Sequence, residues 1–136
     1  MAPRSTEGGE RVLGHEQDPP RLALPPTVVA AHLRTCAEEL AASLQPGGSP
    51  ATAGELAEVV DHLVAGQQAL ASALAGLAVR VDAAETLAAA PPVDLEVVTE
   101  VLRAAATAVA CSAEALDEAR PSFECVSESA GPDTHL

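Results

Sequence analysis

Leucines recur at every seventh position in the segment 56–81, and this spacing constrains the fold more than any other feature of the chain. The repeating leucines are Leu56, Leu63, Leu70 and Leu77, and the positions between them are Val60, Gln67, Leu74 and Val81. Alternating steps of three and four residues place all eight side chains along one side of an α-helix. Such a stripe is buried against other helices, so the segment predicts a coiled coil or a helical bundle.

The residues beside this stripe favour a bundle over a two-stranded zipper. In a parallel zipper the flanking positions are charged and select the partner. Here they are Ala57, Val64, Ala71 and Ala78 on one side, and Val59, Gly66, Ala73 and Arg80 on the other. An apolar band of this width needs more than one neighbouring helix. Small flanking residues also allow helices to approach closely, which suits antiparallel helices within one chain.

Two more segments share the helical period, and capping signals give their limits. Residues 27–44 and 94–119 carry apolar side chains in three- and four-residue steps, with Thr27 and Asp94 as expected N-caps. The central helix begins either at a Thr52–Glu55 capping box or at Ser49 followed by proline. Prolines are expected to end the second and third helices. The predicted helices therefore span about 27–44, 52–83 and 94–119.

The predicted fold is all-α, an up-down-up three-helix bundle over residues 27–120. Its second and third helices form a long antiparallel helical hairpin, because the connection between them is short. Residues 1–26 are predicted to be a disordered N-terminal arm, and residues 121–136 a mobile C-terminal tail. The expected core residues are Leu63, Leu70, Leu74, Leu77, Leu102 and Leu116.

Charge excludes several classes of partner. The formal net charge is −13, all seven basic residues are arginine, and no segment forms a basic patch. We therefore expect no binding to nucleic acid and no attachment to anionic membranes. The N-terminal sequence has no apolar stretch typical of a secretory signal, and no apolar run of about 20 residues is free of charge. A cytoplasmic location is expected.

The sequence offers little reactive chemistry. His32 and Cys36 are four residues apart on one helix, and with Cys111 they could supply sulfur and nitrogen ligands to zinc. Cysteine on an apolar stripe behaves as a small hydrophobic residue, however, and no C-x-x-C pair is present. We expect no metal site, no cofactor and no small-molecule substrate. Neither a nucleophile elbow nor a phosphate-binding glycine loop occurs, so no catalytic residues are predicted and the chain is expected not to be an enzyme.

The segment 69–79 is uncharged on every side, and it suggests the function. The residues expected on its outer surface are Ala69, Ser72, Ala75, Gly76 and Val79. A helix that is apolar all round is usually covered all round. These five residues are the candidate interface of a non-enzymatic helical interaction module that self-associates, as a homo-oligomer, through the apolar face of its second helix.

Two alternatives remain open from the sequence. The first is an accessory or regulatory subunit that binds a different protein chain. The second is a small metal-binding or redox protein that uses His32, Cys36 and Cys111. A further question concerns Gln67, which either fixes register or oligomeric state as a polar residue in the stripe, or lies at the bundle edge and binds water.

Overall fold

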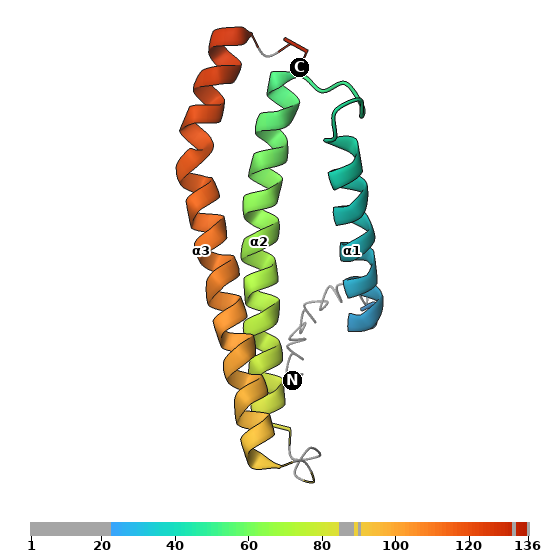
Figure 1. Cartoon of the computed structure of the whole chain (residues 1–136), viewed down its shortest axis with the longest axis vertical. Coiled ribbons are helices and arrows are strands. Elements are labelled where there is room, and N and C mark those ends of the chain that lie inside the picture. The colour runs from blue at the N-terminus through green and yellow to red at the C-terminus, as the bar shows by residue number, and fades with distance from the viewer. Residues whose placement is uncertain (1–22, 85–88, 90, 132, 136) are drawn as a thin grey trace, which may run out of the picture. The chain divides into compact units, whose positions relative to one another are not determined.

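The chain folds into three helices (Figure 1). A computed structural model describes residues 23–84, 89, 91–131 and 133–135. The helices are α1 (Pro26–Ser43), α2 (Ala53–Asp82) and α3 (Pro92–Ala130), and no strand element occurs in the described ranges. The all-α prediction is confirmed. The predicted N-terminal arm falls outside the described residues as far as position 22.

The chain divides into two compact units. Of the described residues, those from 23 to 45 belong to one unit, which contains α1, and those from 46 onward belong to the other, which contains α2 and α3. Helices α2 and α3 pack along each other in opposite directions, as Figure 1 shows. The predicted antiparallel hairpin is therefore confirmed. None of the residues of α1 is fully buried.

Prolines begin α1 and α3, and the predicted caps Thr27 and Asp94 lie inside the first turns. Pro25 and Pro91 hold the N-cap positions, and each is followed by a second proline at the start of the helix. The fixed φ of proline suits the first helical position, where the missing N–H costs nothing. The predicted caps are therefore wrong. The carboxylate of Asp94 instead adds favourable charge to the first turn of α3.

Helix α2 begins with a capping box, which confirms one of the two predicted starts. The Thr52 hydroxyl accepts a hydrogen bond from the Glu55 N–H at 3.1 Å, and the Thr52 N–H donates to Glu55 Oε2 at 2.7 Å. These two bonds satisfy backbone donors that the first turn of a helix leaves free. The other predicted start, at Ser49, is not used, since the helix begins at Ala53.

The C-terminal residues close the open end of the hairpin. Gly131 ends α3 with a φ of 88°, a left-handed conformation that glycine adopts without steric cost. The chain then turns, and the Thr134 carbonyl accepts a hydrogen bond from the Ala53 N–H at 2.9 Å. Thr52 and His135 form an isolated antiparallel bridge beside it. Backbone hydrogen bonding thus connects the start of α2 to the residues that follow α3.

Helix α3 continues through Pro121, so the predicted helix end at residue 119 is wrong. Proline inside a helix donates no hydrogen bond to the carbonyl four residues earlier, and it disfavours helical geometry in the preceding residue. Tertiary contacts on both sides of Pro121 oppose this local penalty. Arg120 pairs with Asp61 on α2, and Thr134 bonds to the start of α2. The helix is held along its neighbour to Ala130.

Replacing Pro121 by alanine should stabilise the protein. A proline in a helix interior costs up to about 3 kcal/mol relative to alanine, and the substitution restores one backbone hydrogen bond. We expect Pro121→Ala to raise the free energy of unfolding measured in urea. The matched control is Pro92→Ala, which should leave that value unchanged or slightly lower, because Pro92 lies at the first helical position. A loss of stability in Pro121→Ala would contradict the continuous helix.

The capping box should make stability depend on pH in the acid range. The hydrogen bond from the Thr52 N–H lowers the pKa of Glu55 below its usual value of 4.5. Bonding with the Thr52 side chain also lowers this pKa, desolvation raises it, and attraction to His135 is the smallest of the lowering effects. A folded-state pKa below the unfolded value stabilises the protein above the unfolded pKa, and this stabilisation is lost as pH falls through the folded pKa.

We therefore expect wild type to be more stable than Glu55→Gln at pH 7. The difference should shrink as pH falls below 4.5 and vanish below the folded pKa. Urea unfolding from pH 7 to pH 2.5 measures it. A constant difference over this range would show that the charge of Glu55 has no part in the cap.

Candidate functional site

Small residues form the centre of the contact between α2 and α3. On α2 the buried positions are Ala53, Val60, Val64, Ala71 and Ala78, and on α3 they are Thr99, Ala106 and Ala113. Half-buried residues alternate with them in steps of three and four. We call the four alanines Ala71, Ala78, Ala106 and Ala113 the alanine seam. Alanine side chains let helix backbones approach more closely than leucines would.

The heptad leucines lie beside the seam rather than in it. At 100° per residue, Leu63, Leu70 and Leu77 point about 80° away from the middle of the buried stripe. Leu63 and Leu70 are half-buried, whereas Leu77 is 48% exposed. The prediction that Leu77 is a core residue is therefore wrong. Of the other predicted core leucines, Leu74, Leu102 and Leu116 are half-buried within the stripe.

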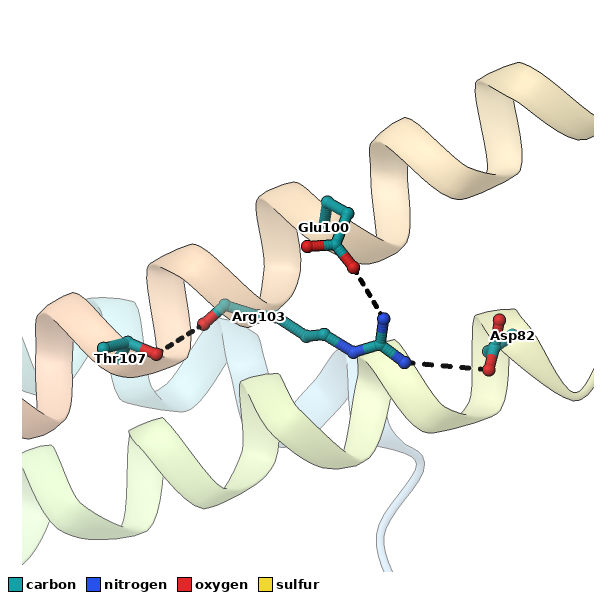
Figure 2. Close-up of polar contacts among 4 residues, drawn as sticks. All are labelled: Asp82, Glu100, Arg103 and Thr107. Carbon is teal, nitrogen blue, oxygen red and sulfur yellow. Dashed lines mark hydrogen bonds and ion pairs between the residues drawn. The ribbon is translucent and has the colours of Figure 1, made fainter.

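Charged side chains occupy one flank of the hairpin. Figure 2 shows Arg103 reaching from α3 towards Asp82 of α2, with Glu100 alongside. Arg103 Nη2 lies 3.7 Å from Asp82 Oδ2, and Nη1 lies 2.7 Å from Glu100 Oε1. Asp82 and Arg103 each follow a residue of the buried stripe by one position, as does Asp61. We call the side of the hairpin that carries these three residues the ion-paired flank.

A second cluster joins the helices near the open end. Arg120 Nε lies 2.9 Å from Asp61 Oδ1 on α2, and Nη2 lies 2.6 Å from Asp117 Oδ1. The Nε contact is an ion pair whose angle falls outside that of a hydrogen bond. All three side chains are more than a third exposed, and such surface pairs contribute only about 0–1 kcal/mol. These pairs therefore contribute more to register than to stability.

The opposite flank is almost free of charge, and it is the main surface that sequence reasoning missed. It consists of the residues that precede the buried stripe by one position. From residue 63 of α2 and residue 98 of α3 onward, they are Leu63, Gly66, Leu70, Ala73, Leu77 and Arg80 on α2, and Val98, Val101, Ala105, Ala108, Ser112, Ala115 and Ala119 on α3. We call this surface the leucine–alanine face. In an antiparallel pair, the residues one position before the stripe lie on the same side of the hairpin in both helices. The two rows therefore form one continuous surface.

Large apolar side chains are exposed on this face. Leu77 is 48% exposed, and Val98 and Val101 of α3 are 46% and 61% exposed. No residue of the face is fully buried. The signal that could have located it is the scarcity of charge immediately before the stripe positions of both helices, where only Arg80 and Asp94, near the ends joined by the connection, carry charge. An exposed apolar surface of this extent is typical of a contact site.

The five predicted interface residues are all exposed. Val79 is the largest of them, with 63% of its surface accessible. Ser72, Ala75 and Val79 follow the buried stripe by one position, on the same side as the ion pairs, whereas Ala69 and Gly76 lie on the side of α2 farthest from α3. Apart from Val79 they are small, so this outer surface offers less apolar area than the leucine–alanine face.

Besides Arg120 Nε, two buried side-chain polar atoms of the described hairpin residues lack a hydrogen-bond partner. Gln67 is half-buried within the stripe, and its Oε1 is buried without a hydrogen-bond partner among the described residues. Thr99 is 2% exposed, and its hydroxyl likewise has no partner there. Thr99 also lines a hollow of about 270 Å³ with Val81 and Arg103. That volume falls just below the range of about 300–1,000 Å³ usual for ligand pockets.

The residues considered for metal chemistry are separated along the chain. His32 and Cys36 lie on α1, and Cys111 lies on α3. All three are exposed, and the described cysteines carry free thiols. Across the described residues no group of three or more His, Cys, Asp and Glu side chains is placed to hold a metal ion.

By length and composition, α2 is long and apolar enough to cross a membrane. Its most apolar 18 residues have a mean hydropathy of 1.3, and 11% of them are buried within the protein. Core helices of soluble proteins also meet these two criteria.

Comparison of the chain with known protein families, with curated proteins and with solved structures finds no match.

A larger side chain in the alanine seam should destabilise the hairpin. Ala113 is 1% exposed, so Ala113→Leu forces α2 and α3 apart. Overpacking of this kind costs about 1–3 kcal/mol, which urea unfolding can measure. Ala104→Leu is the matched control, because Ala104 is exposed on the same helix away from the seam. Equal stability of the two variants would contradict close packing at Ala113.

Proposed function

We propose that this chain is a non-enzymatic helical interaction module that self-associates through the apolar surface of α2. The observation that carries the proposal is the segment 69–79, which has no charged residue and only two buried ones, Ala71 and Ala78. The remaining residues are exposed or half-buried, although the segment lies in the middle of a long helix. Contiguous apolar surface that is exposed on a folded chain often marks a contact with another protein.

The distribution of charge supports the same proposal. The net charge of −13 is carried elsewhere on the chain and keeps it soluble. The apolar surface of α2 can therefore stay exposed in the free chain without causing general aggregation. Association through such a surface is driven by the burial of apolar area and is opposed by repulsion between two acidic chains.

The test is the molar mass of the purified chain, measured by light scattering after gel filtration from about 1 to 200 µM. We expect the mass to rise above the 13.7 kDa of a single chain with increasing concentration. Salt should strengthen the association, because it screens repulsion between acidic chains. The mass should therefore be higher at 0.5 M than at 0.05 M sodium chloride.

A mass that stays at 13.7 kDa over the whole concentration range would contradict self-association. The accessory-subunit alternative, in which a different chain covers the same surface, would then replace it. Association that weakens in high salt would also contradict the proposal, since it would indicate contacts through ion pairs rather than apolar surface.

A further inference from the structure

We infer that two copies of the chain pair through their leucine–alanine faces, about a two-fold axis parallel to the helices, to form a four-helix bundle. This inference rests on the proposed self-association. It selects the leucine–alanine face over the outer surface of α2, which carries Ala69, Ser72, Ala75, Gly76 and Val79.

The leucine–alanine face complements itself in the size of its side chains. Its α2 row carries the leucines Leu63, Leu70 and Leu77. Its α3 row carries only alanine and serine from Ala105 to Ala119. Large side chains pack best against small ones across an interface. In each copy, the leucines of α2 form a ridge and the small residues of α3 form a groove. The ridge of one copy can therefore pack into the groove of the other.

The register of the hairpin shows how two copies would fit. Asp82 and Arg103 form an ion pair across the hairpin, so they lie at about the same level. Leu77 is five residues before Asp82, and Ala108 is five residues after Arg103. Because the helices are antiparallel, Leu77 and Ala108 lie at about the same level. A two-fold axis parallel to the helices keeps that level and places α2 of one copy beside α3 of the other. Leu77 of each copy then lies against Ala108 of the second copy.

The extent of the face suits a stable but modest dimer. At 1.5 Å per residue, the α3 row from Val98 to Ala119 is roughly 30 Å long. Two helices packed 8–10 Å apart give a width of roughly 20 Å. The footprint is therefore roughly 600 Å² on each copy, at the lower end of the range for specific interfaces. A single further helix from another protein would cover only part of this width.

The charges are placed so that pairing buries almost none of them. Arg80 is the only charged residue within the α2 row of the flank, and it lies at the edge, next to the end of the helix. Asp61, Asp82, Arg103 and Arg120 lie on or towards the ion-paired flank, which faces outward in the proposed dimer. Apart from Arg80, no charged residue of the two rows is brought into the contact, so the desolvation of charge opposes pairing only slightly.

The test uses the same substitution at two exposed alanines of α2. Ala73 lies on the leucine–alanine face, and Ala75, two residues later, lies on the outer surface. Ala73→Glu and Ala75→Glu add equal charge to the same helix, and circular dichroism checks that both remain helical. We expect Ala73→Glu to weaken the dimer at least tenfold by light scattering, whereas Ala75→Glu should change its dissociation constant less than threefold.

Disulfide cross-linking tests the axis independently of these variants. In a background with Cys36, Cys111 and Cys125 changed to serine, Leu77→Cys chains and tagged Ala108→Cys chains are mixed and oxidised with copper-phenanthroline. We expect a disulfide between the two different chains and little between two Leu77→Cys chains. A strong disulfide between two Leu70→Cys chains would place α2 against α2 and overturn the proposed axis.

The outcomes separate this inference from the proposed function. A wild-type chain that is monomeric at all concentrations defeats both. If the chain is dimeric, but Ala75→Glu dissociates it and Ala73→Glu does not, self-association stands. The contact is then the outer surface of α2 rather than the leucine–alanine face.

Discussion

The close packing of α2 against α3 through small residues is the contact on which the rest of the hairpin depends. Alanine contributes little buried area per residue, and with one phenylalanine, no tryptophan and no tyrosine the chain has almost no aromatic side chains to compensate. The hairpin therefore gains its stability over length, along 30 residues of α2. This close packing leaves Leu63, Leu70 and Leu77 beside the seam, because small residues occupy its centre. The exposed apolar face is thus a by-product of how the hairpin itself packs.

Much of the fold could be predicted from the period of the sequence. Three helices, the antiparallel pairing of the second and third, and the capping box at Thr52 all follow from local patterns of apolar and capping residues. The rotation of the helices about their own axes could not be predicted in the same way. Heptad positions occupied by leucine and by alanine are both apolar, and the sequence alone does not say which set faces the partner helix. Close approach favours the alanines, so Leu77 is exposed.

The end of α3 shows a second limit of local reasoning. Pro121 is a strong local stop signal, but ion pairing at Arg120 and bonding at Thr134 act across the hairpin and outweigh it. Contacts between residues far apart in the sequence leave no local pattern. The candidate interface shows the same difficulty, because the leucine–alanine face combines rows from two helices. Each row looks ordinary in the sequence, and the surface exists only once the helices are paired.

The alanine seam has a consequence for alignment. Since Ala71 and Ala78, like Ala106 and Ala113, are seven residues apart, sliding α3 along α2 by one heptad would still match alanine with alanine in one layer. The seam discriminates poorly between such slipped states. Discrimination comes from features that occur once: the pairing of Arg103 with Asp82, that of Arg120 with Asp61, and the Ala53 to Thr134 hydrogen bond. Weak surface contacts thus select one alignment among several that the interior tolerates.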